Sequence, residues 1–198
     1  MTPATSPARL AAVVLAGGES RRFGGDKLAA DIDGRSLLDH ALDQLPSDAR
    51  TAVVGPVRTL GRAVTFLRED PPGGGPAAAL VTGLLWALEL GAEVIVTLPG
   101  DAPAGGRAAA LLVAELGSTE QAVVGLDGSG RQQVLQLALR APAARLLVEL
   151  AGPDRGHDQS VRRLVSVLAP RGLILPAHLS YDIDTADELS HFRNHNRA

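Results

Sequence analysis

Short apolar runs alternate along the chain with longer segments in which apolar residues recur every three to four positions. The runs at 10–18 and 92–98 are almost continuously apolar, which is typical of strands buried on both faces in parallel sheets. The segment 76–91 begins with Pro76 and ends at Gly91, residues favoured in the first turn and just after the last turn of a helix. Buried strands that alternate with helices predict an α/β fold.

The same pattern covers the rest of the chain. Further strands are expected at 50–55, 63–67, 121–126, 132–139 and 172–175, and further helices at 36–45, 107–116, 142–151, 159–168 and after Thr185. Ser36 and Thr185 are suited to cap helix N-termini, and the turn DGSG joins 121–126 to 132–139 as an antiparallel pair. The expected fold is a three-layer α/β/α sandwich with a mostly parallel, Rossmann-like sheet and a small antiparallel element. We expect one domain over 1–198, with residues 1–9 flexible.

The composition excludes several classes of function. The formal net charge is −3, which argues against a nucleic-acid partner, since such a domain needs a basic stripe. The chain has no cysteine, which excludes disulfides, thiolate metal sites and a cysteine nucleophile, and its five histidines lack the spacing of metal ligands. No apolar run approaches the length of a membrane span. We therefore expect a cytoplasmic protein with no membrane partner.

The stretch LAGGESRRFGGDK, residues 15–27, follows the first predicted strand. Its glycines let the backbone approach a ligand, and consecutive N–H groups in such a loop form a concavity that binds anions. A flexible turn would explain the glycines alone, but the neighbouring basic residues favour a phosphate site. Lys27 is the only lysine beside eighteen arginines. A compact ammonium suits a single phosphoryl oxygen in a crowded site better than the broad guanidinium of arginine.

Acidic residues follow other predicted strands, where open α/β sheets bind their ligands. Asp101 follows the strand 92–98 after a short Pro-Gly turn, and Asp70 follows 63–67. Asp182 and Asp184 share one face if YDID is extended. A triphosphate needs a hard cation, and Mg²⁺ takes carboxylate oxygens. Turn formation and helix capping are the structural alternatives for these residues.

These residues resemble a known family. The stretch from Leu15 to Lys27 looks like the signature loop L-A-G-G-x-S-x-R-[MF]-G-x-D-K of nucleotidyltransferases, and the likeness is strongest to the molybdenum cofactor guanylyltransferases. It extends through REDPPGGGPAAAL, LPGDAP, GRQQVLQLALR and YDIDTADEL. The resemblance implies Mg²⁺-dependent transfer of GMP from GTP to the terminal phosphate of molybdopterin. It also allows for transient contact with a protein that carries the cofactor.

The resemblance also assigns roles to residues. Lys27, Arg22 and Asp101 are the expected catalytic residues, Asp101 and Asp184 bind the metal together with Asp182, and Arg22, Arg162 and Asp182 face the acceptor. A solvated helix face is the alternative for Arg162. The expected nucleotide contacts are Leu15, Ala16, Gly17, Gly18, Ser20, Lys27, Asp70, Gly75, Pro76, Ala77 and Asp101.

Two nucleotides, GTP and CTP, are candidates for the donor substrate. The family usually has N-[IV]-N-T where this chain has Asp182 and Asp184, and aspartate at both positions is more similar to related cytidylyltransferases. The pair Gly17-Gly18 favours guanylyl transfer, because Ala-Gly is common in the cytidylyl branch. Gly55 lies near a position that some guanylyltransferases fill with a base-facing asparagine. A third possibility, from another class, is a non-catalytic regulator that binds a nucleoside triphosphate.

Overall fold

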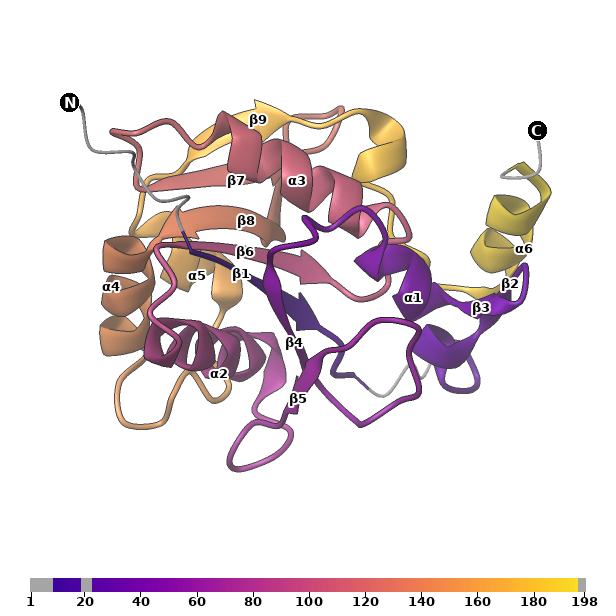
Figure 1. Ribbon diagram of the computed structural model, residues 1–198, viewed down its shortest axis with the longest axis horizontal. Coiled ribbons are helices and arrows are strands. Elements are labelled where there is room, and N and C mark those ends of the chain that lie inside the picture. The colour runs from indigo at the N-terminus through magenta and orange to yellow at the C-terminus, as the bar shows by residue number, and fades with distance from the viewer. Residues whose placement is uncertain (1–8, 19–22, 196–198) are drawn as a thin grey trace.

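The computed structural model describes residues 9–18 and 23–195, which form a seven-stranded sheet in the order β5-β4-β1-β6-β8-β7-β9 (Figure 1). The strands of this sheet are β1 (Leu10–Leu15), β4 (Arg50–Val54), β5 (Thr65–Leu67), β6 (Val94–Pro99), β7 (Ala122–Leu126), β8 (Gln132–Arg140) and β9 (Arg171–Ile174). β1, β4, β5 and β6 are parallel, whereas β8 runs antiparallel to both of its neighbours. The edge strand β9 is parallel to β7.

Helices cover both faces of the sheet, so the expected three layers are confirmed (Figure 1). One face packs against α2 (Gly75–Glu89), α4 (Ala141–Ala151) and α5 (Val161–Ser166), and the other against α1 (Leu37–Leu42) and α3 (Gly105–Glu115). Helix α6 (Ala186–His195) lies to the side of the sheet and adds Leu189 to the apolar cluster of the second layer (Figure 1). Within β1, Val13 and Leu15 face the first of these layers, whereas Ala12 and Val14 face the second. This alternation explains why the whole strand is apolar.

Several element boundaries differ from the sequence prediction. The helix expected at 36–45 ends at Leu42, because Asp43 is extended and Gln44 takes a φ of 62°. The pattern did not indicate the short hairpin of β2 (Asp31–Ile32) and β3 (Arg35–Ser36), or the 3₁₀ turns η1 (Lys27–Ala29) and η2 (Ala177–Leu179). Both predicted caps are confirmed, since Ser36 accepts from the N–H of Asp39 and Thr185 from that of Glu188.

Most of the segment predicted to be flexible, residues 1–9, lies outside the described residues, which begin at Arg9. Within 9–18 and 23–195, none of the helices has the length and apolar character needed to cross a membrane.

The first turn of α3 lies against the chain that leaves α1. A Cβ added at Gly106 would lie 1.8 Å from the backbone oxygen of Asp43. We expect Gly106→Ala to lower the free energy of unfolding by about 1–3 kcal/mol, because backbone must move to make room and the gain in helix propensity is smaller. Urea denaturation measures this, with Gly128→Ala as the control, since a Cβ at Gly128 meets nothing within 4 Å. Unchanged stability of Gly106→Ala would contradict the close approach.

Candidate functional site

Three charged side chains from distant parts of the sequence meet beyond the carboxyl end of β1. The ammonium of Lys27 donates hydrogen bonds to Oδ2 of Asp101 at 2.8 Å and to Oδ1 of Asp184 at 3.0 Å. Lys27 is only 8% exposed, whereas the Asp184 side chain is 58% exposed. The cluster is therefore closed on the lysine side and open to solvent on the side of Asp184.

The sheet explains why these residues meet. Lys27 begins η1 after β1, and Asp101 lies two residues beyond the end of β6, which pairs with β1 so that Leu15 is opposite Pro99. The N–H of Gly100 donates to the carbonyl of Leu15 at 2.9 Å and continues this register past the strand end. The N–H of Ile183 donates to the carbonyl of Asp101 at 3.0 Å, which brings Asp184 to the same place.

The surroundings of the cluster shift the pKa values of both Lys27 and Asp182, for different reasons. Burial alone would lower the pKa of Lys27, but the hydrogen bonds and charges of Asp101 and Asp184 outweigh it and raise this pKa above its usual value. Burial raises the pKa of Asp182 to about 7, and the negative charges of Asp101 and Asp184 add to this effect. The charge of an ionised Asp182 is therefore disfavoured, first by its burial and then by the two neighbouring carboxylates.

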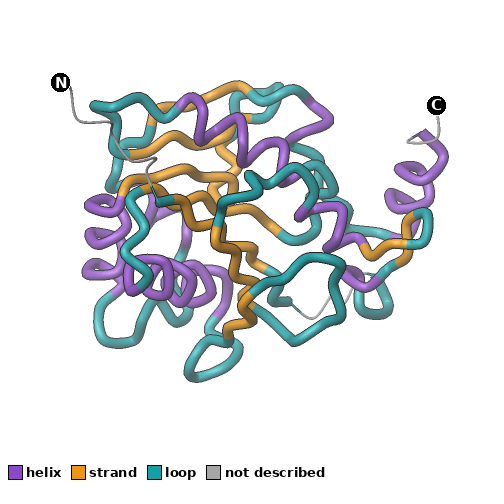
Figure 2. The backbone as a smooth tube through the Cα atoms, viewed as in Figure 1, coloured by secondary structure: helices purple, strands orange, loops and turns teal. Residues whose placement is uncertain are grey.

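A second ion pair fixes the backbone next to Lys27. Arg58, in the long loop after β4 (Figure 2), binds both carboxylate oxygens of Asp26, through Nε at 2.9 Å and Nη2 at 3.0 Å. Oδ1 of Asp26 also accepts from the N–H of Leu28 and so caps η1. The hydrogen bond and charge of Arg58 lower the pKa of Asp26 despite its partial burial. The turn that carries Lys27 is thus attached to the loop after β4.

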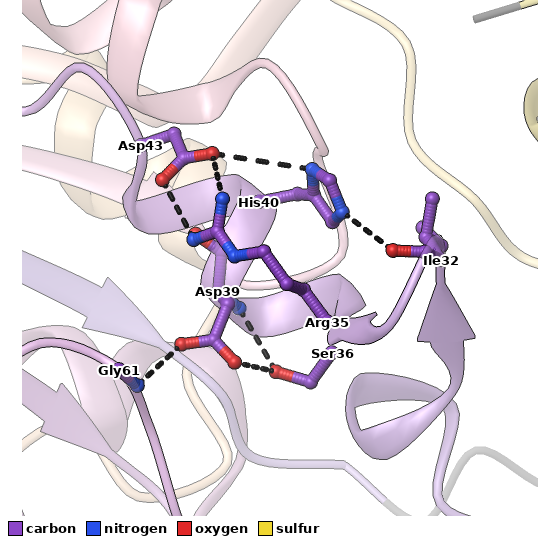
Figure 3. A network of polar contacts seen from close by, with 7 residues as sticks. All are labelled: Ile32, Arg35, Ser36, Asp39, His40, Asp43 and Gly61. Carbon is purple, nitrogen blue, oxygen red and sulfur yellow. Dashed lines mark hydrogen bonds and ion pairs between the residues drawn. The ribbon is translucent and has the colours of Figure 1, made fainter. Parts of the chain in front are cut away.

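A network of polar contacts holds the far end of the same loop (Figure 3). The N–H of Gly61 donates to Oδ1 of Asp39 at 2.8 Å, and the hydroxyl of Ser36 donates to Oδ2 at 2.6 Å. Arg35 binds both carboxylate oxygens of Asp43, at 2.7 and 2.8 Å. Burial would raise the pKa of Asp39, but these hydrogen bonds outweigh it and lower the pKa. The loop is therefore anchored at both ends.

Glycines bring the neighbouring loops close together at this edge of the sheet. A Cβ at Gly55 would lie 2.5 Å from the backbone oxygen of Ala16, so Gly55 allows the end of β4 to approach the glycine-rich loop. Gly18 takes a φ of 122° and Gly75 a φ of 81°, which glycine adopts readily. Because α2 begins at Gly75, the loop after β5 leads directly into the N-terminus of a helix.

The structure places the other residues that the sequence predicted for the site as follows. Leu15, Ala16 and Ala77 are buried, whereas Gly17, Gly18, Asp70 and Pro76 are exposed. Arg162, in α5, donates to the carbonyl of Gln132 at 3.2 Å and makes no hydrogen bond to the Lys27 cluster within the described chain. Ser20 and Arg22 lie outside the described residues.

Sequence reasoning missed the pair of Arg58 and Asp26. Asp26 lies within the recognised loop, but an arginine 32 positions away gives no local signal.

Within the described part of the chain, no three acidic or histidine side chains converge tightly enough to form a preformed metal site. The positive charge between Asp101 and Asp184 is supplied instead by Lys27.

A glycine-rich loop after the first strand, with a lysine and two carboxylates beyond the strand ends, is an arrangement suited to bind phosphate groups. Residues 12–171 match the MobA-like NTP transferase domain, and the chain belongs to that family. It is similar to proteins named molybdenum cofactor guanylyltransferase from Cereibacter sphaeroides, 35% identical over 96 residues, and Acidiphilium cryptum, 37% identical over 100 residues. These matches cover 46% and 48% of this chain and 49% and 51% of the relatives, so the chain spans about half the length of the curated relatives it matches.

The fold is also that of solved relatives. The molybdopterin-guanine dinucleotide biosynthesis protein A from Archaeoglobus fulgidus superposes with a TM-score of 0.65 over 94% of this chain and 98% of its own, at 18% identity. At this identity the likeness concerns the fold alone.

Proposed function

We propose that this protein transfers GMP from GTP to the terminal phosphate of molybdopterin, with release of pyrophosphate. The observation that carries the proposal is the Lys27 ammonium held between Asp101 and Asp184 at the end of a glycine-rich loop. The names of the similar proteins support the choice of GTP and molybdopterin. The cytoplasmic location expected from the sequence stays a prediction.

The proposed reaction needs no general base. An oxygen of the acceptor phosphate, already anionic, attacks the α-phosphorus of GTP, and the bond to the bridging oxygen of the β-phosphate breaks so that pyrophosphate leaves. Alignment and charge stabilisation are then the main tasks of the protein. Lys27 binds an oxygen of the α- or β-phosphate, while N–H groups of the Gly17-Gly18 loop face the phosphates. Arg22 keeps its expected role toward the phosphates and acceptor.

The carboxylates fit a divalent cation. Asp101 and Asp184 offer the oxygen ligands that Mg²⁺ prefers, and the space between them already receives the positive charge of Lys27. Bound there, Mg²⁺ supplies charge neutralisation and polarisation of the phosphate oxygens. In the nucleotide-bound protein, Lys27 would bind phosphate in place of its carboxylate partners, so that one ammonium would serve both states.

A thermal-shift screen of the four nucleoside triphosphates with Mg²⁺ tests the proposal. We expect GTP to raise the unfolding temperature most, because a ligand at 100 times its Kd adds about 2.7 kcal/mol to stability. A preference for CTP would instead favour cytidylyl transfer, the alternative that Asp182 and Asp184 support by their resemblance to cytidylyltransferases. Binding of GTP without pyrophosphate release in the presence of molybdopterin would point to a regulator.

A further inference from the structure

Lys27 stands between an exposed segment of the chain and a buried one. Gly24, Gly25 and Asp26 before it are exposed, and Gly24 takes a φ of 77°. Leu28 after it is 5% exposed and belongs to the apolar core. Glycines leave the backbone many conformations, so the segment before Lys27 must be restrained at Asp26 if the ammonium is to keep its place.

Arg58 provides this restraint. Its side chain is 12% exposed although Val57 beside it is 79% exposed, so the arginine is turned inward from the loop after β4. Nε and Nη2 donate to the carboxylate of Asp26 at 2.9 and 3.0 Å, and Nη1 donates to the carbonyl of Pro56 at 3.1 Å. A bidentate pair of this kind fixes the orientation of both side chains as well as their distance.

The pair reaches Lys27 through the backbone. Oδ1 of Asp26 accepts from Nη2 of Arg58 and also from the N–H of Leu28, at 3.2 Å. That second bond caps η1, and Lys27 is the first residue of η1. The guanidinium therefore holds the carboxylate in the orientation in which it caps the turn that carries Lys27.

The loop that carries Arg58 is itself fixed at both ends. The N–H of Gly55 donates to the carbonyl of Leu67 at 2.9 Å, and the N–H of Gly61 donates to Oδ1 of Asp39 at 2.8 Å. These bonds tie the loop to β5 and to α1. Arg58 consequently connects η1 to a part of the chain whose position is set by the sheet.

We infer that Arg58 is a positioning residue of the proposed reaction, which acts through Asp26 to hold the ammonium of Lys27 where it meets the phosphates. This inference rests on the proposed function. If the ion pair of Arg58 and Asp26 served only to stabilise the loop after β4, its removal would act in the same way whether or not Lys27 is present. A positioning role instead requires that the effect depends on Lys27.

A double-mutant cycle tests this dependence. Arg58→Met keeps an apolar side chain of similar length and removes every hydrogen-bond donor. We expect it to lower the rate of single-turnover pyrophosphate release, at saturating GTP, Mg²⁺ and molybdopterin, by about 10-fold, a usual coupling within one hydrogen-bond network. In a Lys27→Ala protein the same substitution should lower the rate by no more than about twofold, because the group that it positions is absent.

Arg171→Met is the matched control. Arg171 also binds both carboxylate oxygens of a partner, Glu120, but it lies in β9 at the opposite edge of the sheet from β5. We expect this variant to keep the wild-type rate. Urea denaturation verifies that each variant is folded, and Arg58→Lys takes the place of Arg58→Met should the latter not fold.

A second measurement needs no reaction. Lys27 is the only lysine, so ¹³C-labelled lysine reports on its Cε alone, and in the nucleotide-free protein this signal should shift in Arg58→Met but not in Arg171→Met. An unshifted signal, or equal losses of rate with and without Lys27, overturns the role of Arg58 and leaves guanylyl transfer standing. A shifted signal in a protein that does not transfer GMP removes the proposed reaction and leaves Arg58 as the residue that places Lys27.

Discussion

Asp101→Asn is expected to lower the rate of pyrophosphate release by at least about 100-fold while the protein remains folded. A metal ion contributes several kcal/mol to the stabilisation of transition-state charge, and each 1.4 kcal/mol changes the rate tenfold. A neutral amide binds Mg²⁺ poorly, so most of this contribution is lost. The measurement is single-turnover pyrophosphate release with GTP, Mg²⁺ and molybdopterin.

The free energy of unfolding and a control variant show whether a lower rate reflects lost catalysis or a misfolded protein. The amide oxygen that Asp101→Asn introduces can still accept from Lys27, which also keeps Asp184, so we expect the free energy of unfolding to fall by no more than about 3 kcal/mol, the upper range for a hydrogen bond to a charged group. Asp187→Asn removes an exposed carboxylate of the same C-terminal segment as Asp184, in the first turn of α6, and should retain the wild-type rate. Near-normal release by Asp101→Asn would remove Asp101 from the site.

Lys27→Arg is expected to lower kcat by on the order of 100-fold, with a much smaller loss of GTP affinity. Lys27 is 8% exposed and its ammonium fits between two carboxylate oxygens at 2.8 and 3.0 Å. A planar guanidinium has no room to take the same point and must displace the phosphate or the cation. A misplacement of about 1 Å near the reacting atoms costs on the order of 100-fold in rate.

Two measurements decide the role of Lys27. Single-turnover release at saturating GTP and acceptor compares the wild type with Lys27→Arg, and Lys27→Ala should weaken both binding and rate. Because Lys27 is the only lysine, protein made with ¹³C-labelled lysine gives one side-chain Cε signal, which should shift when GTP and Mg²⁺ replace its carboxylate partners. Equal release rates for lysine and arginine would mean that the charge alone matters.

The local pattern of apolar and polar residues was sufficient to predict the main strands and helices and the positions of some site residues. β1 and β6 are almost continuously apolar because helices cover both faces, and this made the strand ends, and therefore Lys27 and Asp101, recognisable. The short hairpin of β2 and β3 escaped notice, because two-residue strands leave no periodicity. The length of helix α1 was overestimated, since its apolar spacing continues to Leu45 although Gln44 turns the backbone.

Other parts of the site depend on three-dimensional contacts that no local pattern encodes. Arg58 binds Asp26 across 32 positions, and Glu69 is buried although both of its neighbours in the sequence are exposed. The sequence singled out Asp70 as the acidic residue next to the nucleotide, which stays a prediction, and the structure shows that Asp70 is exposed while Glu69 is buried. Burial of a polar side chain is a property of the packed structure, so it became visible only there.

The hydrogen bonds of Lys27 to Asp101 and Asp184 join residues 74 and 157 positions apart in the sequence. Contacts of such long range form late in folding, because the intervening chain must be ordered before they contribute. An intermediate that has paired β1 with β6 but has not docked residues 181–184 contains Lys27 and Asp101 without Asp184. The proposed site for a nucleotide and its cation is therefore completed only when the C-terminal segment docks, and detachment of that segment removes Asp184 from it.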